Sequence, residues 1–180
     1  MSKNKNHIIV VNEKDEWIGT MEKLEAHQSG VLHRAFSVFI LNSKNQMLLQ
    51  RRALDKYHSG GRWSNACCSH PQPGESTIGA AHRRLREELG FDCELKPLFH
   101  LRYKSDVGEL LIENEYDHIY YGIYDGSIEP HPDEVMDYQF IGLDEIETWR
   151  KEKPQEFTAW FHLAMPHFLK PPVNASAVIQ

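Results

Sequence analysis

GESTIGAAHRRLREELG, residues 74–90, is the stretch that decides the fold of this chain. Ser76 is a residue type preferred at helix N-caps, and Gly90 is the type most favoured just beyond a helix C-terminus. The apolar residues between them recur at helical spacing: Ile78, Ala81, Leu85 and Leu89. We therefore predict a helix that begins after Ser76, ends near Leu89 and buries one apolar face.

The segments around this helix mostly have the composition of β-strands. Residues 35–41 are β-branched and aromatic and predict a buried strand, which a turn at 42–45 would connect to a return strand at 46–51. Other strands are predicted at 7–11 (an edge strand), 17–24, 63–70, 91–101, 111–124 and 138–141, with loops at 26–30 and 54–62 and helices at 143–151 and 155–169. The pattern favours an α+β fold of packed layers. We expect a single domain over residues 1–170, followed by a mobile tail at 171–180.

Composition narrows the function classes. The 180 residues carry a formal net charge of −6, which argues against non-specific nucleic-acid binding, although a local cluster of Arg51, Arg52 and Lys56 would suit a small anion. No apolar run approaches the roughly 20 residues of a membrane span. Three cysteines without a disulfide framework, and an N-terminus without an apolar signal region, predict a cytoplasmic protein.

Two pairs of polar residues share strand faces. The side chains of residues two apart on a strand point to the same face of the sheet. Glu113 and Glu115 therefore share one face, and Cys68 and His70 share one face. Two carboxylates in an otherwise apolar strand are costly unless a cation neutralises them. Two alternatives stay open: an edge strand with its acidic face in water, and a Cys68 that is only a small buried hydrophobe.

The helix resembles the second half of the Nudix box, through Gly74-Glu75 and residues 80–90. The resemblance implies a Nudix-type α/β/α sandwich of a mixed sheet and flanking helices. Hydrolases of that superfamily carry Arg-Glu where this chain has Arg83-Arg84. Because a carboxylate that would help bind metal is replaced by a fixed cation, the helix is suited to gripping a diphosphate and not to cutting it.

Three further stretches resemble the type 1 isopentenyl diphosphate isomerases: residues 51–56 (RRALDK), 65–71 (NACCSHP) and 112–115 (IENE). The resemblance runs from about His7 to Trp160. It implies conversion of isopentenyl diphosphate to dimethylallyl diphosphate through a tertiary carbocation, with a small allylic or homoallylic diphosphate as the partner molecule. No nucleic acid or membrane partner is expected, and the oligomeric state is expected to be a monomer or a weak homodimer.

The resemblance also assigns roles to residues. Cys68 and Glu115 are expected to transfer the protons, with Tyr103 hydrogen-bonded to Glu115. The residues expected to bind substrate are Lys23, Arg52, Lys56, Arg84 and Trp160. Cys67 lies one residue out of register and should face the other way.

Two divalent ions are expected. A Mg²⁺ that bridges the diphosphate would be held by Glu88. A second ion, Mn²⁺, Mg²⁺ or Zn²⁺, would be held by three imidazoles and two carboxylates: His27, His33, His70, Glu113 and Glu115. The main alternative is a Nudix hydrolase of a nucleotide or other diphosphate, and a second is a diverged sensor that only binds a diphosphate.

Overall fold

The computed structural model describes residues 6–170, and the expected tail at 171–180 lies outside them. The predicted central helix is α2 (Thr77–Leu89), with the Ser76 hydroxyl accepting a hydrogen bond from the Gly79 N–H and Gly90 closing the helix in the left-handed region. Among the described helices, none is long and apolar enough to cross a membrane.

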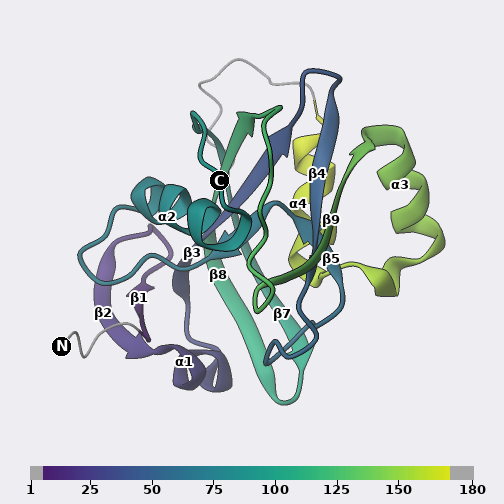
Figure 1. The fold of residues 1–180 in the computed structure, drawn as a ribbon. Helices are drawn as coiled ribbons and strands as arrows, with labels where there is room; N and C mark the ends of the chain where they lie inside the picture. The colour runs from purple at the N-terminus through teal and green to yellow at the C-terminus, as the bar shows by residue number, and fades with distance from the viewer. Residues whose placement is uncertain (1–5, 171–180) are drawn as a thin grey trace.

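A mixed sheet forms the middle layer (Figure 1). β3 (His33–Leu41) pairs in parallel with β8 (Leu111–Ile123) and antiparallel with β1 (His7–Val11), β4 (Gln46–Arg52) and β6 (Cys67–Ser69). β4 also pairs with β5 (Trp63–Asn65) and β9 (Val135–Gly142). β7 (Lys96–Gly108) and β8 form the long hairpin that projects from the layer.

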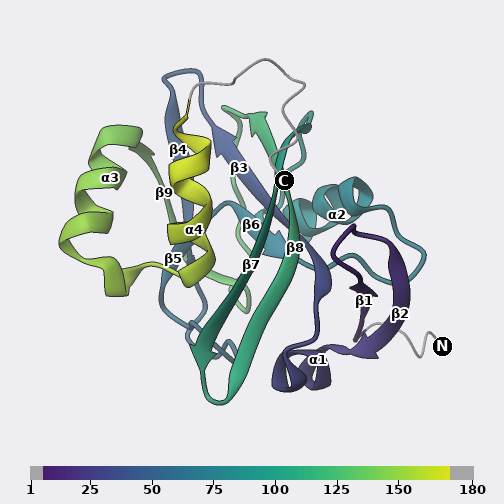
Figure 2. The ribbon, with the colours of Figure 1, turned by 180° about the vertical axis from the view of Figure 1, so that it is seen from behind.

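Helices cover both faces of this sheet, as Figures 1 and 2 show from opposite sides. On one face, Phe36, Val38 and Ile40 of β3 pack with Leu85 and Leu89 of α2. On the other face lies a second core, which includes Phe39, Ile119, Phe157 and Phe161 and packs against α3 (Leu143–Glu152) and α4 (Ala159–Phe168). The layered α+β sandwich expected from the sequence is confirmed.

The N-terminal region differs from the prediction. The strand expected at 17–24 ends earlier, as β2 (Trp17–Glu22), and β2, not β1, lies at the sheet edge. The loop expected at 26–30 is wrong, because α1 (Lys23–Ser29) occupies it. The Glu22 carboxylate caps this helix at the Glu25 N–H, and Gly30 ends it. The polar composition reflects the outer face of α1, while Ala26 and His27 are buried.

Two other boundaries are also corrected. Residues 91–95 are not strand, and β7 begins at Lys96 and runs on to Gly108. The helix expected at 155–169 is a short 3₁₀ turn, η1 (Pro154–Glu156), followed by α4 from Ala159. The break occurs because Phe157 is extended and bridges to Trp63, and the Thr158 N–H donates to the Trp63 carbonyl.

Candidate active site

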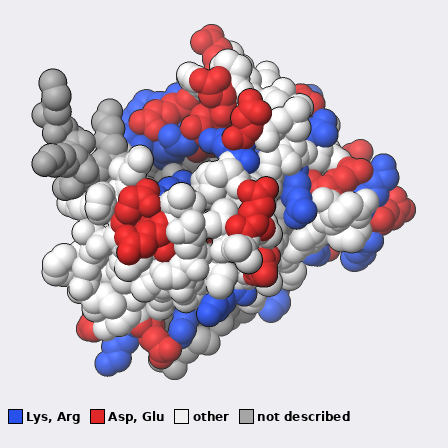
Figure 3. All heavy atoms as spheres, turned by 90° about the horizontal axis from the view of Figure 1, so that it is seen from below, with Lys and Arg blue, Asp and Glu red and all other residues white. Residues whose placement is uncertain are grey.

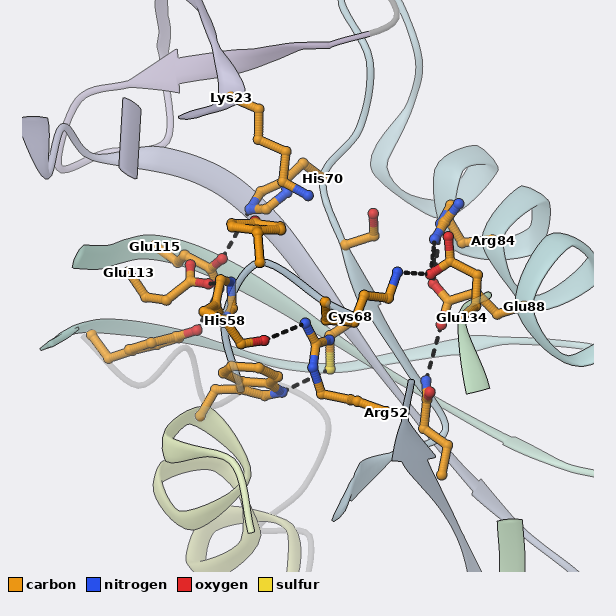
Figure 4. Close-up of a pocket in the computed structure, with 16 residues that line it drawn as sticks. Lys23, Arg52, His58, Cys68, His70, Arg84, Glu88, Glu113, Glu115 and Glu134 are labelled. Atoms are coloured by element: carbon orange, nitrogen blue, oxygen red, sulfur yellow. Dashed lines mark hydrogen bonds and ion pairs between the residues drawn. The ribbon is translucent and has the colours of Figure 1, made fainter. Parts of the chain in front are cut away.

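A pocket opens where α1, the 53–62 loop, β6, β8 and α4 converge. Figure 4 shows its two ends, with a histidine and glutamate cluster on one side and an arginine and glutamate cluster on the other. Cys68 lies between them. On the face drawn in Figure 3, acidic and basic side chains are interspersed.

The first end is the metal-ligand cluster, which we define as His27, His33, His70, Glu113 and Glu115. One ligand atom from each of these residues lies within 4.8 Å of the others. The sheet creates this arrangement, because the parallel pairing of β3 with β8 sets His33 directly beside Glu115. α1 contributes His27, and His70 directly follows the end of β6.

Several polar atoms of this cluster are buried and have no hydrogen-bond partner. They include Nε2 of His27, Nε2 of His33 and Oε2 of Glu113. The other ring nitrogens are held by backbone, with His27 Nδ1 at 2.6 Å from the Lys23 carbonyl and His33 Nδ1 at 2.8 Å from the Val31 carbonyl. Buried polar atoms are rarely left unpaired. The free nitrogens and carboxylate oxygen therefore fit a divalent cation.

Burial also sets the charge of these ligands. It lowers the pKa of His33 to about 4 and lowers that of His70, so both rings stay neutral and keep a lone pair for a metal. Burial and the charge of neighbouring Glu113 raise the pKa of Glu115. Burial opposes the charge of Glu113, but the neighbouring His27 and His58 rings leave its pKa well below the usual range, so Glu113 carries the negative charge of the pair while Glu115 favours its protonated form.

Cys68 lies beside this cluster, among polar groups. Its thiol donates to Asn65 Oδ1 at 3.0 Å, and its sulfur accepts from Trp160 Nε1 at 3.1 Å. Ser37 Oγ is 3.4 Å away. Burial raises the pKa of Cys68 to about 12, so the group is a thiol and not a thiolate near neutral pH.

Two neighbouring residues behave as the sequence predicts. Tyr103 donates its hydroxyl to Glu115 Oε2 at 2.5 Å, across the β7–β8 pair. Cys67 lies on the opposite face of β6 from Cys68, fully buried against α2, where its thiol is 3.4 Å from Glu88 Oε1.

The second end is the cation cluster, which we define as Lys56, Arg84, Glu88 and Glu134. Arg84 donates to Glu88 Oε1 from both Nη2, at 2.8 Å, and Nε, at 3.1 Å, and its Nη2 is 3.2 Å from Glu134 Oε2. Lys56 donates to the same Glu134 oxygen. Burial opposes the charge of Arg84, but the surrounding carboxylates, Glu88 foremost, leave its pKa raised.

Glu88 is already engaged on both of its oxygens. Oε1 accepts from Arg84, and Oε2 accepts from Gln50 Nε2 at 3.0 Å. A cation that bound here would therefore have to share Glu88 with a guanidinium.

The other two expected anion-binding residues lie over aromatic rings. The Lys23 ammonium is 4.9 Å from the Tyr57 ring centroid, and the Arg52 guanidinium is 5.2 Å from that of Trp160. Burial lowers the pKa of Lys23. The structure therefore brings all the predicted site residues to one pocket or its immediate wall. Among the four expected anion-binding cations, Lys56 and Arg84 share a carboxylate, Glu134.

Sequence reasoning missed several residues of the site, among them Tyr57, His58, Asp117 and Glu134. Asp117 had a usable signal, because it continues the two-residue period of Glu113 and Glu115 on β8. Its Oδ2 accepts from Ser37, and burial raises its pKa to about 7. Tyr57 and His58 follow the 51–56 motif without any pattern of their own, and Glu134 lies far from every motif.

Comparisons with known proteins identify relatives of this chain. The sequence profile of the NUDIX domain matches residues 31–161. An isopentenyl-diphosphate Delta-isomerase from Pectobacterium atrosepticum is 52% identical over 156 residues, which cover 87% of this chain and 87% of that protein. The isomerase of the same name from Burkholderia multivorans is 47% identical and covers 86% of this chain and 88% of its own length.

Solved structures extend the likeness in fold alone. A Deinococcus radiodurans protein matches with a TM-score of 0.75 at 18% identity, covering 89% of this chain and 98% of its own. A MutT NUDIX hydrolase from Burkholderia pseudomallei matches with a TM-score of 0.60 at 20% identity, covering 75% of this chain and 96% of its own. The sheet and helices described above are thus shared with proteins of very different sequence.

Proposed function

The chain belongs to the NUDIX family and, within it, to the isopentenyl-diphosphate Delta-isomerases, and we propose that Cys68 and Glu115 carry the proton transfers of its isomerisation. The reaction converts isopentenyl diphosphate to dimethylallyl diphosphate. The observation that carries the assignment of residues is that a buried thiol and a Tyr103-bonded carboxylate line one pocket, between a metal-ligand cluster and a set of cations.

The chemistry requires two proton transfers and no net loss of atoms. One group gives a proton to the terminal carbon of the C=C bond, which leaves a tertiary carbocation. The other group removes a proton from the neighbouring CH₂, and the electron pair forms the new double bond. Burial keeps the Cys68 thiol protonated and raises the pKa of Glu115, so both groups can hold a proton and give it up. Glu115 Oε2 accepts from Tyr103, and its Oε1 lies 3.0 Å from His70 Nε2, on the side of the metal-ligand cluster.

The wall of the pocket suits a cationic intermediate. The Trp160 side chain is 4% exposed, and its Nε1 hydrogen bond to Cys68 fixes the ring beside the thiol. An aromatic face attracts a cation by about 2 kcal/mol or more when water is excluded. We assign Trp160 this role toward the carbocation.

The two expected ions have separate sites in this proposal. NUDIX enzymes use divalent ions, and we assign an inner ion (Mn²⁺, Mg²⁺ or Zn²⁺) to the metal-ligand cluster and a diphosphate-bridging Mg²⁺ to Glu88. When bound, the inner ion would neutralise Glu113 and Glu115 and hold Glu115 in place. Lys23, Arg52, Lys56 and Arg84 would bind and orient the diphosphate without breaking it.

The hydrolase expected as the main alternative is disfavoured. Arg84 stands where a carboxylate would help bind metal, and the curated relatives at 45–52% identity carry the isomerase name. The partner is a small diphosphate. The cytoplasmic location and the monomer or weak homodimer stay predictions.

One incubation tests reaction class and proton exchange together. The purified protein with Mg²⁺ and isopentenyl diphosphate in deuterated water should yield dimethylallyl diphosphate that carries deuterium. The proposal would be contradicted if only unchanged isopentenyl diphosphate were recovered, or if inorganic phosphate were released in place of the isomer.

A further inference from the structure

The pocket contains a histidine to which the proposed chemistry gives no role. His58 lies in the loop between β4 and β5, and its side chain is only 3% exposed. Its Nε2 is 3.0 Å from Glu113 Oε1. Figure 4 shows His58 beside the two glutamates. A buried imidazole against a proposed metal ligand needs a physical explanation.

The two oxygens of Glu113 face different partners. Oε2 faces the histidines, at 3.3 Å from His27 Nε2 and 3.9 Å from His33 Nε2, and it has no hydrogen-bond partner. Oε1 faces His58. A carboxylate turns about its last carbon–carbon bond, so a contact at one oxygen fixes the direction of the other. We propose that His58 is a positioning residue that keeps Glu113 Oε2 directed at the metal-ligand cluster.

His58 is itself held from three sides. Its carbonyl accepts from Arg52 Nη2 at 3.2 Å. Its Nδ1 is 3.3 Å from Ser59 Oγ, and a hydroxyl that donates there leaves the ring proton on Nε2, which faces the carboxylate. Its ring meets Tyr57 and Trp160 edge to face, with centroids 4.4 Å and 5.8 Å apart.

The backbone conformation of the loop also supports a positioning role for His58. Ser59 has a φ of 53°, in the left-handed region that a non-glycine residue seldom adopts. Strain of this kind persists where surrounding contacts over-determine it, and it clusters at functional sites. Here the strained residue directly follows His58 and places its hydroxyl against the ring.

His58 acts from outside the ligand group. It is not one of the five residues whose ligand atoms lie within 4.8 Å of one another. Partners that hold a ligand by its other atom typically change metal affinity by roughly 10–100-fold when removed. That range sets the size of the effect to be measured.

The inference rests on the metal site proposed above, and a direct binding measurement separates the two. Metal-free protein would be titrated with Zn²⁺ against a chromophoric chelator at fixed pH, without substrate. Zn²⁺ is chosen because imidazole nitrogens suit it. His58→Ala should bind Zn²⁺ roughly 10–100-fold more weakly than the wild type. His58→Phe should lose as much although its ring still packs, and His58→Gln should recover part of the affinity because its amide can donate.

Two controls fix the meaning of the result. His131→Ala removes a histidine whose side chain is 55% exposed and should leave the affinity unchanged. His27→Ala should abolish binding at the cluster. Thermal unfolding of each metal-free variant checks that it folds.

The outcomes are distinct. If His58→Ala and His58→Phe both bind as tightly as the wild type, the role of His58 is wrong while the metal site stands. If the wild type binds no Zn²⁺, or binding survives His27→Ala unchanged, the metal site is wrong and this inference falls with it.

Discussion

Both ends of the pocket contain glutamates, but they differ in whether the buried polar groups are paired. In the metal-ligand cluster, buried nitrogens and a carboxylate oxygen have no partner. In the cation cluster, each charged group is paired with another, and Glu134 Oε2 serves both Lys56 and Arg84. Both ends hold carboxylates, yet only the first lacks the positive charge to match them.

Because of this contrast, the two ends make different demands on a ligand. A cation at the metal-ligand cluster would meet buried atoms that have no partner, and it would displace the contact between His70 Nε2 and Glu115 Oε1. The cation cluster is neutralised by its own glutamates, so a diphosphate has to exchange existing ion pairs for new ones. The affinity of the metal-ligand cluster for a cation should therefore depend mainly on its own nitrogen and oxygen atoms. The affinity of the cation cluster for a diphosphate should also depend on the strength of the ion pairs that the diphosphate replaces.

The largest expected effect lies between the two ends. Cys68→Ala and Glu115→Gln should each lower kcat by roughly 10²–10⁴-fold, the usual contribution of a general acid or base. Cys67→Ala is the matched control, because it alters the neighbouring sulfur on the opposite strand face, and its kcat should stay within a few-fold of wild type. Steady-state kinetics on folded variants decides, and a severe loss in Cys67→Ala with mild loss in Cys68→Ala would reverse the assignment.

The second effect concerns pH and belongs to the metal-ligand end alone. Burial lowers the pKa of His33 from 6.5 to about 4 in the folded, metal-free protein. Between those values the unfolded chain binds more protons than the folded one, so stability is full above pH 6.5 and falls as pH drops toward 4. The loss at His33 should amount to roughly 3 kcal/mol. Arg84 keeps its charge across this window.

Urea unfolding with excess chelator at pH 7 and pH 4.5 measures this effect. His33→Asn should lose less stability on acidification than the wild type, because the titrating ring is gone. Equal losses in the two proteins would show that His33 is not held neutral by burial.

The third effect is stabilisation by metal. An ion that binds only the folded chain adds about 2.7 kcal/mol to the free energy of unfolding when present at 100 times its Kd. Thermal unfolding should therefore shift upward with added Mn²⁺ or Zn²⁺ in the wild type. Glu113→Gln should remove most of the shift, whereas Glu87→Gln, at an exposed partner of Arg84, should preserve it. A shift that Glu113→Gln leaves intact would place the ion elsewhere.

The smallest effect tests the cation end. Glu134→Gln removes the carboxylate shared by Lys56 and Arg84 and should tighten binding of inorganic pyrophosphate. Since ion pairs near the surface contribute about 0.2–1 kcal/mol, the gain should be roughly 1.4- to fivefold. Asp133→Asn removes the same charge one residue away, on a side chain that is 89% exposed, and should change little. Calorimetry with pyrophosphate decides, and weaker binding in Glu134→Gln would show that the glutamate supports the ligand.

Features that depend on residues close together in the sequence could be predicted, and features that depend on distant residues mostly could not. α2 followed from local signals, because Ser76, Gly90 and the apolar spacing lie within one segment. The five residues of the metal-ligand cluster were also named from motif and strand period, and the structure brings them together. α1 was missed because its polar composition resembles a loop. Its buried face becomes visible only when Ala26 and His27 meet the rest of the fold.

The missed site residues share a different cause. His58 and Glu134 act through partners that are 55 and 78 positions away in the sequence, Glu113 and Lys56. No local pattern marks such residues, because their roles arise from tertiary contact. The break before α4 is of the same kind, because it arises where Phe157 pairs with Trp63.

The parallel pairing of β3 with β8 has a consequence for how the protein is made. His33 and Glu115 become neighbours only when these two strands meet, and the whole segment between the strands must be synthesised first. Pairing over such sequence separation is slow, because the loop must close before contacts reward it. A nascent chain that lacks β8 has neither carboxylate of the cluster, so the five residues can meet around an ion only after β8 has been made and has paired with β3.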